Sequence, residues 1–96
     1  MRLSKDEIDG IKRAFKEVFK EGKIYLFGSR VDDNKRGGDI DLYIIPKMEI
    51  EDIREKKIEF LVKLDKYIGE QKIDVVIAKD KNRLIEQEAL KRGVEL

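Results

Sequence analysis

The sequence contains no cysteine and no histidine. Without cysteine, the chain can form neither a disulfide nor a thiolate metal site. Without histidine, imidazole general bases, Ser-His triads and histidine-ligated zinc are all excluded. Any chemistry must therefore depend on carboxylates, amines, hydroxyls and bound metal ions.

The chain also lacks long apolar runs and a strong excess of charge of either sign. No stretch approaches the roughly 20 apolar residues that cross a membrane, and the first residues lack the apolar segment of a signal peptide. The 22 basic and 21 acidic residues leave a net charge of +1, which gives no basic footprint for nucleic acid. We therefore expect a cytoplasmic protein that binds neither membranes nor, directly, nucleic acid.

What is present is a series of helix and strand patterns that suits one domain over residues 1–96. Ser4 and Glu7 form a capping box, and Pro46, the only proline, closes a strand. The patterns predict helices over about 4–21, 49–68 and 82–92, and strands over about 23–27, 39–45 and 72–78. The last helix has an apolar side formed by Leu84, Ile85, Ala89 and Leu90. This order predicts an α/β (α+β) fold, with a small mixed sheet of about three to four strands covered by helices.

The second predicted strand carries two aspartates, Asp39 and Asp41, separated by one residue. In a strand, residues i and i+2 project from the same face, so the two carboxylates lie side by side. Aspartate is depleted in strands, and like charges on one face repel each other. The pair therefore indicates a bound cation, and magnesium is the usual partner of such carboxylates.

Asp74 is a third acidic residue within a predicted strand, between Ile73 and Val75. If this strand pairs beside the strand of Asp39 and Asp41, their carboxylates converge on one face. Such a cluster can bind two divalent metals, which lie about 3.5–4 Å apart in two-metal sites. One metal would activate an attacking hydroxyl, and the other would neutralise a leaving pyrophosphate.

Gly28 and Ser29, at the end of the first predicted strand, offer a complementary anion site. Glycine lets phosphate oxygens approach the backbone, and amide N–H groups at the start of a helix can hold the anion. Ser29 can donate its hydroxyl, and Arg30 can add charge-assisted hydrogen bonds. The simpler alternatives are a turn that only ends the strand, and aspartates that lie on a solvated sheet face.

Gly28-Ser29, the spaced Asp39-Ile40-Asp41-Leu42 and Asp74 together resemble the signature of the DNA polymerase beta nucleotidyltransferase superfamily. The short chain points to the minimal nucleotidyltransferase branch, to which the MntA-like antitoxins belong. The segment from Leu84 to Leu90, followed by Gly93-Val94, is similar to the tail of that branch. The resemblance covers most of the chain from the first predicted strand onward.

The resemblance implies a role for each residue of the motif. The metal ligands and catalytic carboxylates would be Asp39, Asp41 and Asp74, holding one or two Mg²⁺ ions, with Asp74 also helping to activate the acceptor hydroxyl. The nucleotide-binding residues, which hold the triphosphate of the donor ATP, would be Gly28, Ser29 and Arg30. The implied partner is a HEPN-family toxin, which the protein would AMPylate on a tyrosine as its antitoxin. A homodimer and a hetero-oligomer are both compatible with the sequence.

The loop between the two motif segments departs from the family pattern. Members often continue Gly-Ser-Arg with Ala-Arg-Gly, where this chain has Val31-Asp32-Asp33, and a serine often stands where Gly38 precedes the first aspartate. Lys35 or Arg36 could replace the missing arginine, or could simply be solubilising loop charges.

Two other functions therefore stay open. The chain could be a catalytically weak or inactive module that neutralises its partner by binding. It could also act on a small molecule such as an aminoglycoside, although members that do so usually add a second domain or dimerise to build the acceptor pocket.

Overall fold

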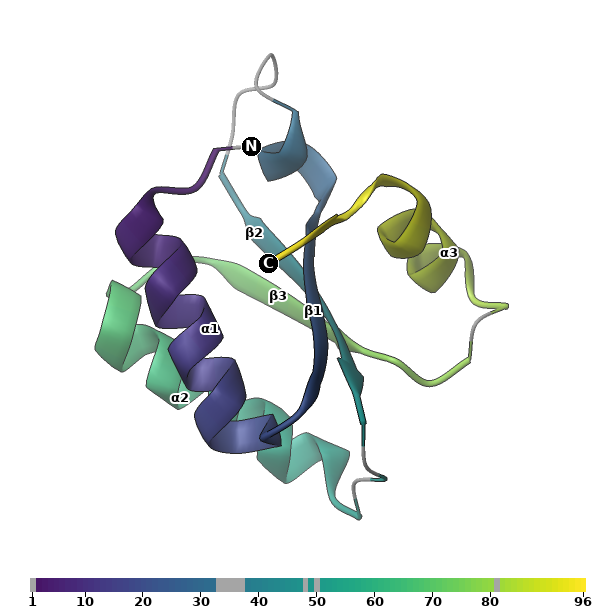
Figure 1. Cartoon of the computed structure of the whole chain (residues 1–96), viewed down its shortest axis with the longest axis horizontal. Helices are drawn as coiled ribbons and strands as arrows, with labels where there is room; N and C mark the ends of the chain where they lie inside the picture. Colours follow the sequence, from purple (N-terminus) through teal and green to yellow (C-terminus); the bar gives the residue numbers. More distant parts are fainter. Residues whose placement is uncertain (1, 33–37, 48, 50, 81) are drawn as a thin grey trace.

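Helices cover both faces of a mixed sheet of four strands (Figure 1). The computed structural model describes residues 2–32, 38–47, 49, 51–80 and 82–96. The elements run in the order α1 (Lys5–Phe19), β1 (Gly22–Phe27), the 3₁₀ helix η1 (Gly28–Val31), β2 (Ile40–Pro46), α2 (Ile53–Ile68), β3 (Ile73–Ile77), α3 (Leu84–Arg92) and β4 (Val94–Glu95). The predicted α+β class and the small mixed sheet are confirmed.

The strand order across the sheet is β3-β2-β1-β4. Strand β1 is antiparallel to both of its neighbours, whereas β2 and β3 are parallel. The parallel pair is joined through α2, because strands that point the same way need a crossover connection. Strand β4 has two residues and was not among the predicted elements. A hydrogen bond of 2.9 Å from the Leu96 amide to the Ile24 carbonyl extends its pairing with β1.

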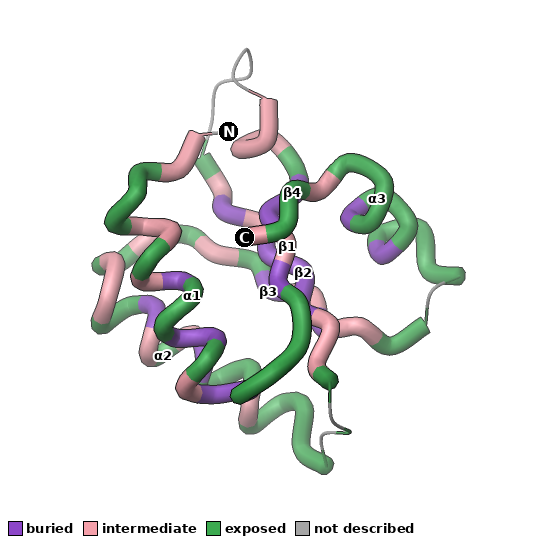
Figure 2. The backbone as a smooth tube through the Cα atoms, viewed as in Figure 1, coloured by how far each residue is buried: buried purple, intermediate pink, exposed green. Residues whose placement is uncertain are grey.

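Alternating strand residues face opposite layers of the molecule. Ile40, Leu42 and Ile44 of β2 are fully buried in the main core, on the face that α1 and α2 cover. The other face packs Phe27 and Tyr43 against Ala89 of α3 in a smaller cluster. In Figure 2 the buried segments of α1 and α2 lie along the sides where these helices meet the rest of the fold, and α3 has two buried residues of its own.

The helix ends follow local capping chemistry. The predicted capping box is confirmed, since the Ser4 hydroxyl accepts from the Glu7 amide at 3.1 Å and the Glu7 carboxylate accepts from the Ser4 amide at 3.0 Å. Helix α2 begins at Ile53 rather than near residue 49, because the Asp52 carboxylate accepts from the Glu55 amide at 3.0 Å and caps the helix there. Helix α2 has 16 residues. Within the described ranges, no helix is long and apolar enough to cross a membrane.

Of the four residues on the predicted apolar side of α3, only Ala89 packs on the sheet. Leu84 is 83% exposed, and Ile85 and Leu90 are also exposed. The two residues that α3 buries fully are Ala89 and Glu86. A buried carboxylate is tolerated only where donors surround it, so the contacts of Glu86 decide how this helix sits.

Candidate active site on the carboxylate face of the sheet

The predicted carboxylates lie near the start of β2 and β3. Asp41 and Asp74 are direct partners in the parallel pairing of these strands, and Asp39 stands immediately before β2. Their apolar neighbours Leu42 and Val75 are buried in the core under α1 and α2, so the carboxylates project from the opposite face. The prediction that the strand of Asp74 pairs beside that of Asp41 is therefore confirmed.

Asp39 has a basic neighbour, Lys72, which had no predicted role. Lys72 Nζ lies 3.4 Å from Asp39 Oδ2, with the two side chains 78% and 41% exposed. Lys72 is placed there by the strand pairing, since its carbonyl accepts from the Ile40 amide at 3.1 Å. An exposed ion pair contributes at most about 1 kcal/mol, so a metal ion can replace the lysine at this carboxylate.

Asp41 lies in the least favourable electrostatic position of the cluster. Its partial burial raises the pKa of the carboxyl, and the negative charges of Asp74, Asp39 and Glu88 raise that pKa further. Glu88 belongs to α3, so the covering helix brings an additional carboxylate towards the cluster. A bound cation is the group that would relieve this repulsion. Glu88 had no predicted role. The only sequence feature that points to it as a neighbour of the cluster is its position in the helix that follows the strand of Asp74.

Gly28 lies directly against the Asp41 carboxylate. In the register of β1 with β2, Phe27 pairs with Asp41. The residue after Phe27 is Gly28, which therefore lies over the side chain of Asp41. A Cβ atom at Gly28 would lie 2.3 Å from Asp41 Oδ2, and its backbone has φ of +78°. Only glycine meets both conditions, so the chain brings bare backbone to the carboxylate cluster.

Replacing Gly28 by alanine is expected to destabilise the fold by about 1–2 kcal/mol from the left-handed backbone alone, with a further loss from the collision with Asp41. The free energy of unfolding measured in urea tests this. Gly38→Ala is the matched control, because a Cβ there would meet no described atom within 4 Å. Equal losses in the two variants would contradict the close approach of Gly28 to Asp41.

Arg30 makes contacts within the protein that differ from its expected role. Its Nη2 and Nε atoms donate to the Gly38 carbonyl at 2.9 and 3.3 Å, and its Nη1 donates to the Arg2 carbonyl at 2.8 Å. In this structure Arg30 therefore holds the two ends of the loop together. Lys35 and Arg36, the suggested replacements for the missing family arginine, lie outside the described residues.

The donor set on this face suits magnesium. Asp39, Asp41 and Asp74 all supply carboxylate oxygens, which are the ligands that Mg²⁺ prefers. Their mutual repulsion at Asp41 is what a divalent ion would neutralise. Within the described ranges, no three or more acidic side chains lie close enough together to hold a metal ion in their present positions. The fold therefore brings the ligands to one face, and metal binding would require their side chains to turn towards a common point.

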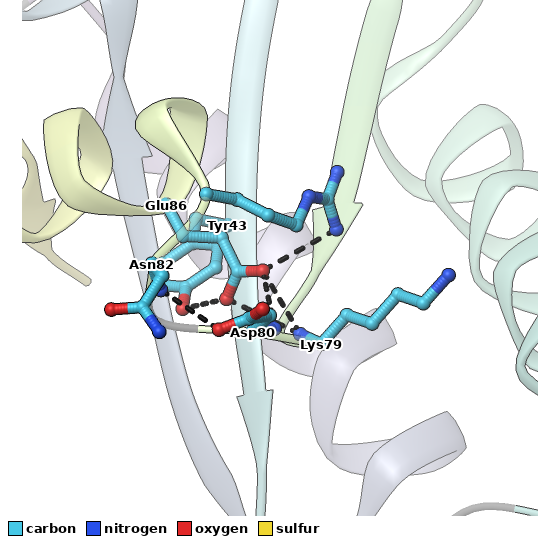
Figure 3. A network of polar contacts seen from close by, with 6 residues as sticks. Tyr43, Lys79, Asp80, Asn82 and Glu86 are labelled. Atoms are coloured by element: carbon cyan, nitrogen blue, oxygen red, sulfur yellow. Dashed lines mark hydrogen bonds and ion pairs between the residues drawn. The ribbon is translucent and has the colours of Figure 1, made fainter.

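Glu86 anchors α3 to the sheet through a network of hydrogen bonds that Figure 3 shows from close by. The side chain is fully buried, and each carboxylate oxygen accepts more than one bond. Its donors are the Tyr43 hydroxyl at 2.7 Å, the Asp80 amide at 2.8 Å, the Lys79 amide at 3.1 Å and Arg83 Nη1 at 3.3 Å. These contacts connect β2, the chain leaving β3, and α3.

The charge of Glu86 is stabilised where it stands. Burial raises the pKa of this carboxyl, but the amide and hydroxyl hydrogen bonds and the charge of Arg83 outweigh burial, so the pKa lies below its ordinary value. The pKa of Tyr43 is raised by burial and then by the Glu86 carboxylate. Glu86 thus fixes the helix that carries Glu88, and a buried acid in the tail was not foreseen from the sequence.

Comparison with known families connects this site to a function. A family model described as "Polymerase beta, Nucleotidyltransferase" matches residues 9–96, which include the sheet, η1 and every carboxylate of the cluster. A comparison with curated proteins found no match. Because the family model spans most of the chain and the motif residues share one face of the fold, the protein belongs to the polymerase beta nucleotidyltransferase family.

Proposed function

We propose that the protein is a magnesium-dependent nucleotidyltransferase that transfers AMP from ATP to a hydroxyl group on a partner protein. The observation that carries this proposal is the in-register pair of Asp41 and Asp74 beside the bare backbone of Gly28. Family membership supports transfer of a nucleotidyl group. The choice of ATP, magnesium and a protein acceptor rests on the resemblance to the minimal branch of that family.

Each residue of the site would have a distinct task. Magnesium held by Asp39, Asp41 and Asp74 would supply charge neutralisation for the triphosphate and lower the pKa of the acceptor hydroxyl. Gly28 leaves room for phosphate oxygens beside the backbone, and Ser29 donates its hydroxyl to them. Asp74 is the most exposed of the three aspartates, so it is the one that an acceptor hydroxyl can reach from solvent.

The transfer forms one bond and breaks one bond. The acceptor oxygen attacks the α-phosphorus of ATP, and the bond from that phosphorus to the pyrophosphate oxygen breaks. Pyrophosphate leaves with the electron pair, and the hydroxyl proton passes to Asp74 and then to solvent. Catalysis is mainly by positioning and electrostatic stabilisation, and the proton acceptor is a carboxylate because the chain has no histidine.

The partner we propose is a HEPN-family toxin, with a tyrosine hydroxyl as acceptor. The tail similarity to the minimal branch motivates this choice. The exposed apolar residues of α2 and α3 are consistent with a protein partner, because Leu84, Val62 and Ile58 are 83%, 64% and 57% exposed.

The experiment is incubation of the protein with ATP, magnesium and a candidate HEPN-family toxin as the partner. Intact mass spectrometry is expected to show one AMP added to the partner. Asp74→Asn should reduce the rate by about a hundredfold or more, because it removes both a metal ligand and the proton acceptor. Asp65→Asn, an exposed aspartate on α2, is the control and should keep the wild-type rate. No AMP addition with the wild type, or an unchanged rate with Asp74→Asn, would refute the proposal.

A second candidate is an antitoxin that neutralises its partner by covering it, with little or no catalysis. The engagement of Arg30 within the protein and of Asp39 with Lys72 favours it, since both contacts compete with ligand binding. If a double variant with both Asp39 and Asp41 replaced by asparagine still inhibits the toxin without nucleotide, this second function is correct.

A further inference from the structure

We infer that Arg2 and Arg30 form an arginine clasp that sets the distance between the phosphate-binding turn and the first metal ligand. The clasp rests on the proposed function, because it assigns positioning residues to the same nucleotide site. Arg2 stands before α1 and is far from the motif in sequence, so no motif includes it. Its place in the structure is beside η1, where the start of the chain also lies in Figure 1.

Arg2 holds the carbonyl groups of η1. Its amide donates to the Arg30 carbonyl at 2.7 Å, and its Nη2 donates to the Ser29 carbonyl at 2.9 Å. Its Nε donates to the carbonyl of Asp32, where the chain leaves η1, at 3.3 Å. The Ser29 carbonyl also accepts from the Asp32 amide at 3.2 Å, so the guanidinium adds a second donor there. Carbonyls at the end of a helical turn are suited to such donors.

Arg30 completes the clasp in the other direction. Its Nη1 donates to the Arg2 carbonyl at 2.8 Å, and its Nη2 and Nε both donate to the Gly38 carbonyl. Gly38 is bonded directly to Asp39. The clasp therefore connects the turn that would hold the triphosphate to the residue that begins the carboxylate cluster.

The clasp is also tied to the first turn of α1. Burial raises the pKa of Glu7, but the hydrogen bonds from Ser4 and Gln71 outweigh burial and lower that pKa. The charge of Arg30 lowers it further. Glu7 accepts from Gln71 Nε2 at 2.9 Å, just before the strand of Asp74. Both arginines thus belong to one polar layer at this end of the sheet, and each lies only partly exposed.

A clasp of this kind predicts a selective loss of phosphate affinity. Arg2→Ala should weaken binding of inorganic tripolyphosphate with magnesium, and raise the KM for ATP, by about tenfold or more, because misplacement of binding groups by a fraction of an ångström has effects of this size. The kcat at saturating ATP should change much less. Adenosine binding should stay unchanged. Arg2→Lys should not restore affinity, since the donors of an ammonium all lie on one nitrogen and cannot reproduce the fixed spacing of Nη2 and Nε.

Calorimetric titration with tripolyphosphate and hydrogen exchange monitored by mass spectrometry test the clasp together. Lys5→Ala, an exposed cation at the start of α1, is the matched control and should behave as wild type. Faster exchange in Arg2→Ala confined to the peptides that contain Ser29 and Asp39 supports the clasp. Unchanged tripolyphosphate affinity in Arg2→Ala overturns the clasp. A loss of tripolyphosphate affinity that only follows global unfolding of the variant overturns it as well.

The two proposals can fail separately. If the wild type binds neither tripolyphosphate nor ATP, the proposed nucleotidyl transfer fails. The exchange at Ser29 and Asp39 in Arg2→Ala then still decides the clasp: faster local exchange keeps it as a device that orders the turn, and unchanged exchange refutes it.

Discussion

Replacing Asp41 by asparagine is expected to abolish nucleotidyl transfer and, in the same protein, to make the metal-free fold more stable. The rate should fall by about a hundred- to a thousandfold, because the variant removes one of the carboxylates proposed to hold magnesium. The charge of that ion would offset the charge of the triphosphate. Stability should rise by about 0.5–1 kcal/mol, since the amide keeps the shape of the side chain and removes its repulsion with Asp74, Asp39 and Glu88.

Thermal unfolding in a chelator, followed by the transfer assay in magnesium, measures both effects. Asp65→Asn removes one negative charge from an exposed position on α2 and controls for net charge. Magnesium should raise the melting temperature of the wild type more than that of Asp41→Asn. A variant that is less stable than wild type in chelator would show that the Asp41 carboxylate is held by favourable contacts, contrary to the repulsion described here.

The largest loss of stability is expected from Glu86→Ala. The substitution removes a fully buried carboxylate and leaves the Tyr43 hydroxyl and the Asp80 amide without their acceptor. Removing one partner from a buried charged network costs about 3–5 kcal/mol, which is a large part of the total stability of a domain this small. Urea denaturation gives the free energy. Tyr43→Phe, which removes only one donor, should cost about 1 kcal/mol.

The Glu86 network also predicts how stability depends on pH. Because the folded-state pKa of Glu86 lies below its ordinary value of 4.5, the network contributes fully above that value and loses its contribution as the pH falls through the folded-state pKa. The difference in unfolding free energy between wild type and Glu86→Gln should therefore shrink at acidic pH. Glu70→Gln, which removes one carboxylate from an exposed position, controls for the change in net charge. The measurement covers about pH 3–7. If the difference in unfolding free energy between wild type and Glu86→Gln stays constant over that whole range, Glu86 is not charged in the folded protein.

Much of the fold could be predicted because local patterns and burial agree. The capping box of Ser4 and Glu7 sets the start of α1, and the apolar alternation of β2 gives both the strand and the face that carries Asp41. The motif spacing also identified Gly28 as the turn beside the carboxylates. These are features in which residues near in sequence determine the outcome.

The features that could not be predicted depend on contacts between distant segments. Glu86 is buried because β2 and the chain leaving β3 supply its donors, and no local pattern reveals those donors. Arg2 joins the site only because the chain before α1 passes beside η1. Strand β4 is too short to have a pattern of its own and forms because β1 offers a free edge.

The pairing of Asp41 with Asp74 has a consequence for how the protein can vary. Two like charges do not select each other, so the register that places them together must be imposed by the apolar residues on the reverse of the same strands, such as Leu42 and Val75. A slip of either strand by one residue would turn the aspartate of that strand into the core. The spacing of the carboxylates is therefore set by core side chains that face away from them, and the sequence between Arg30 and Gly38 can vary while the core keeps that spacing.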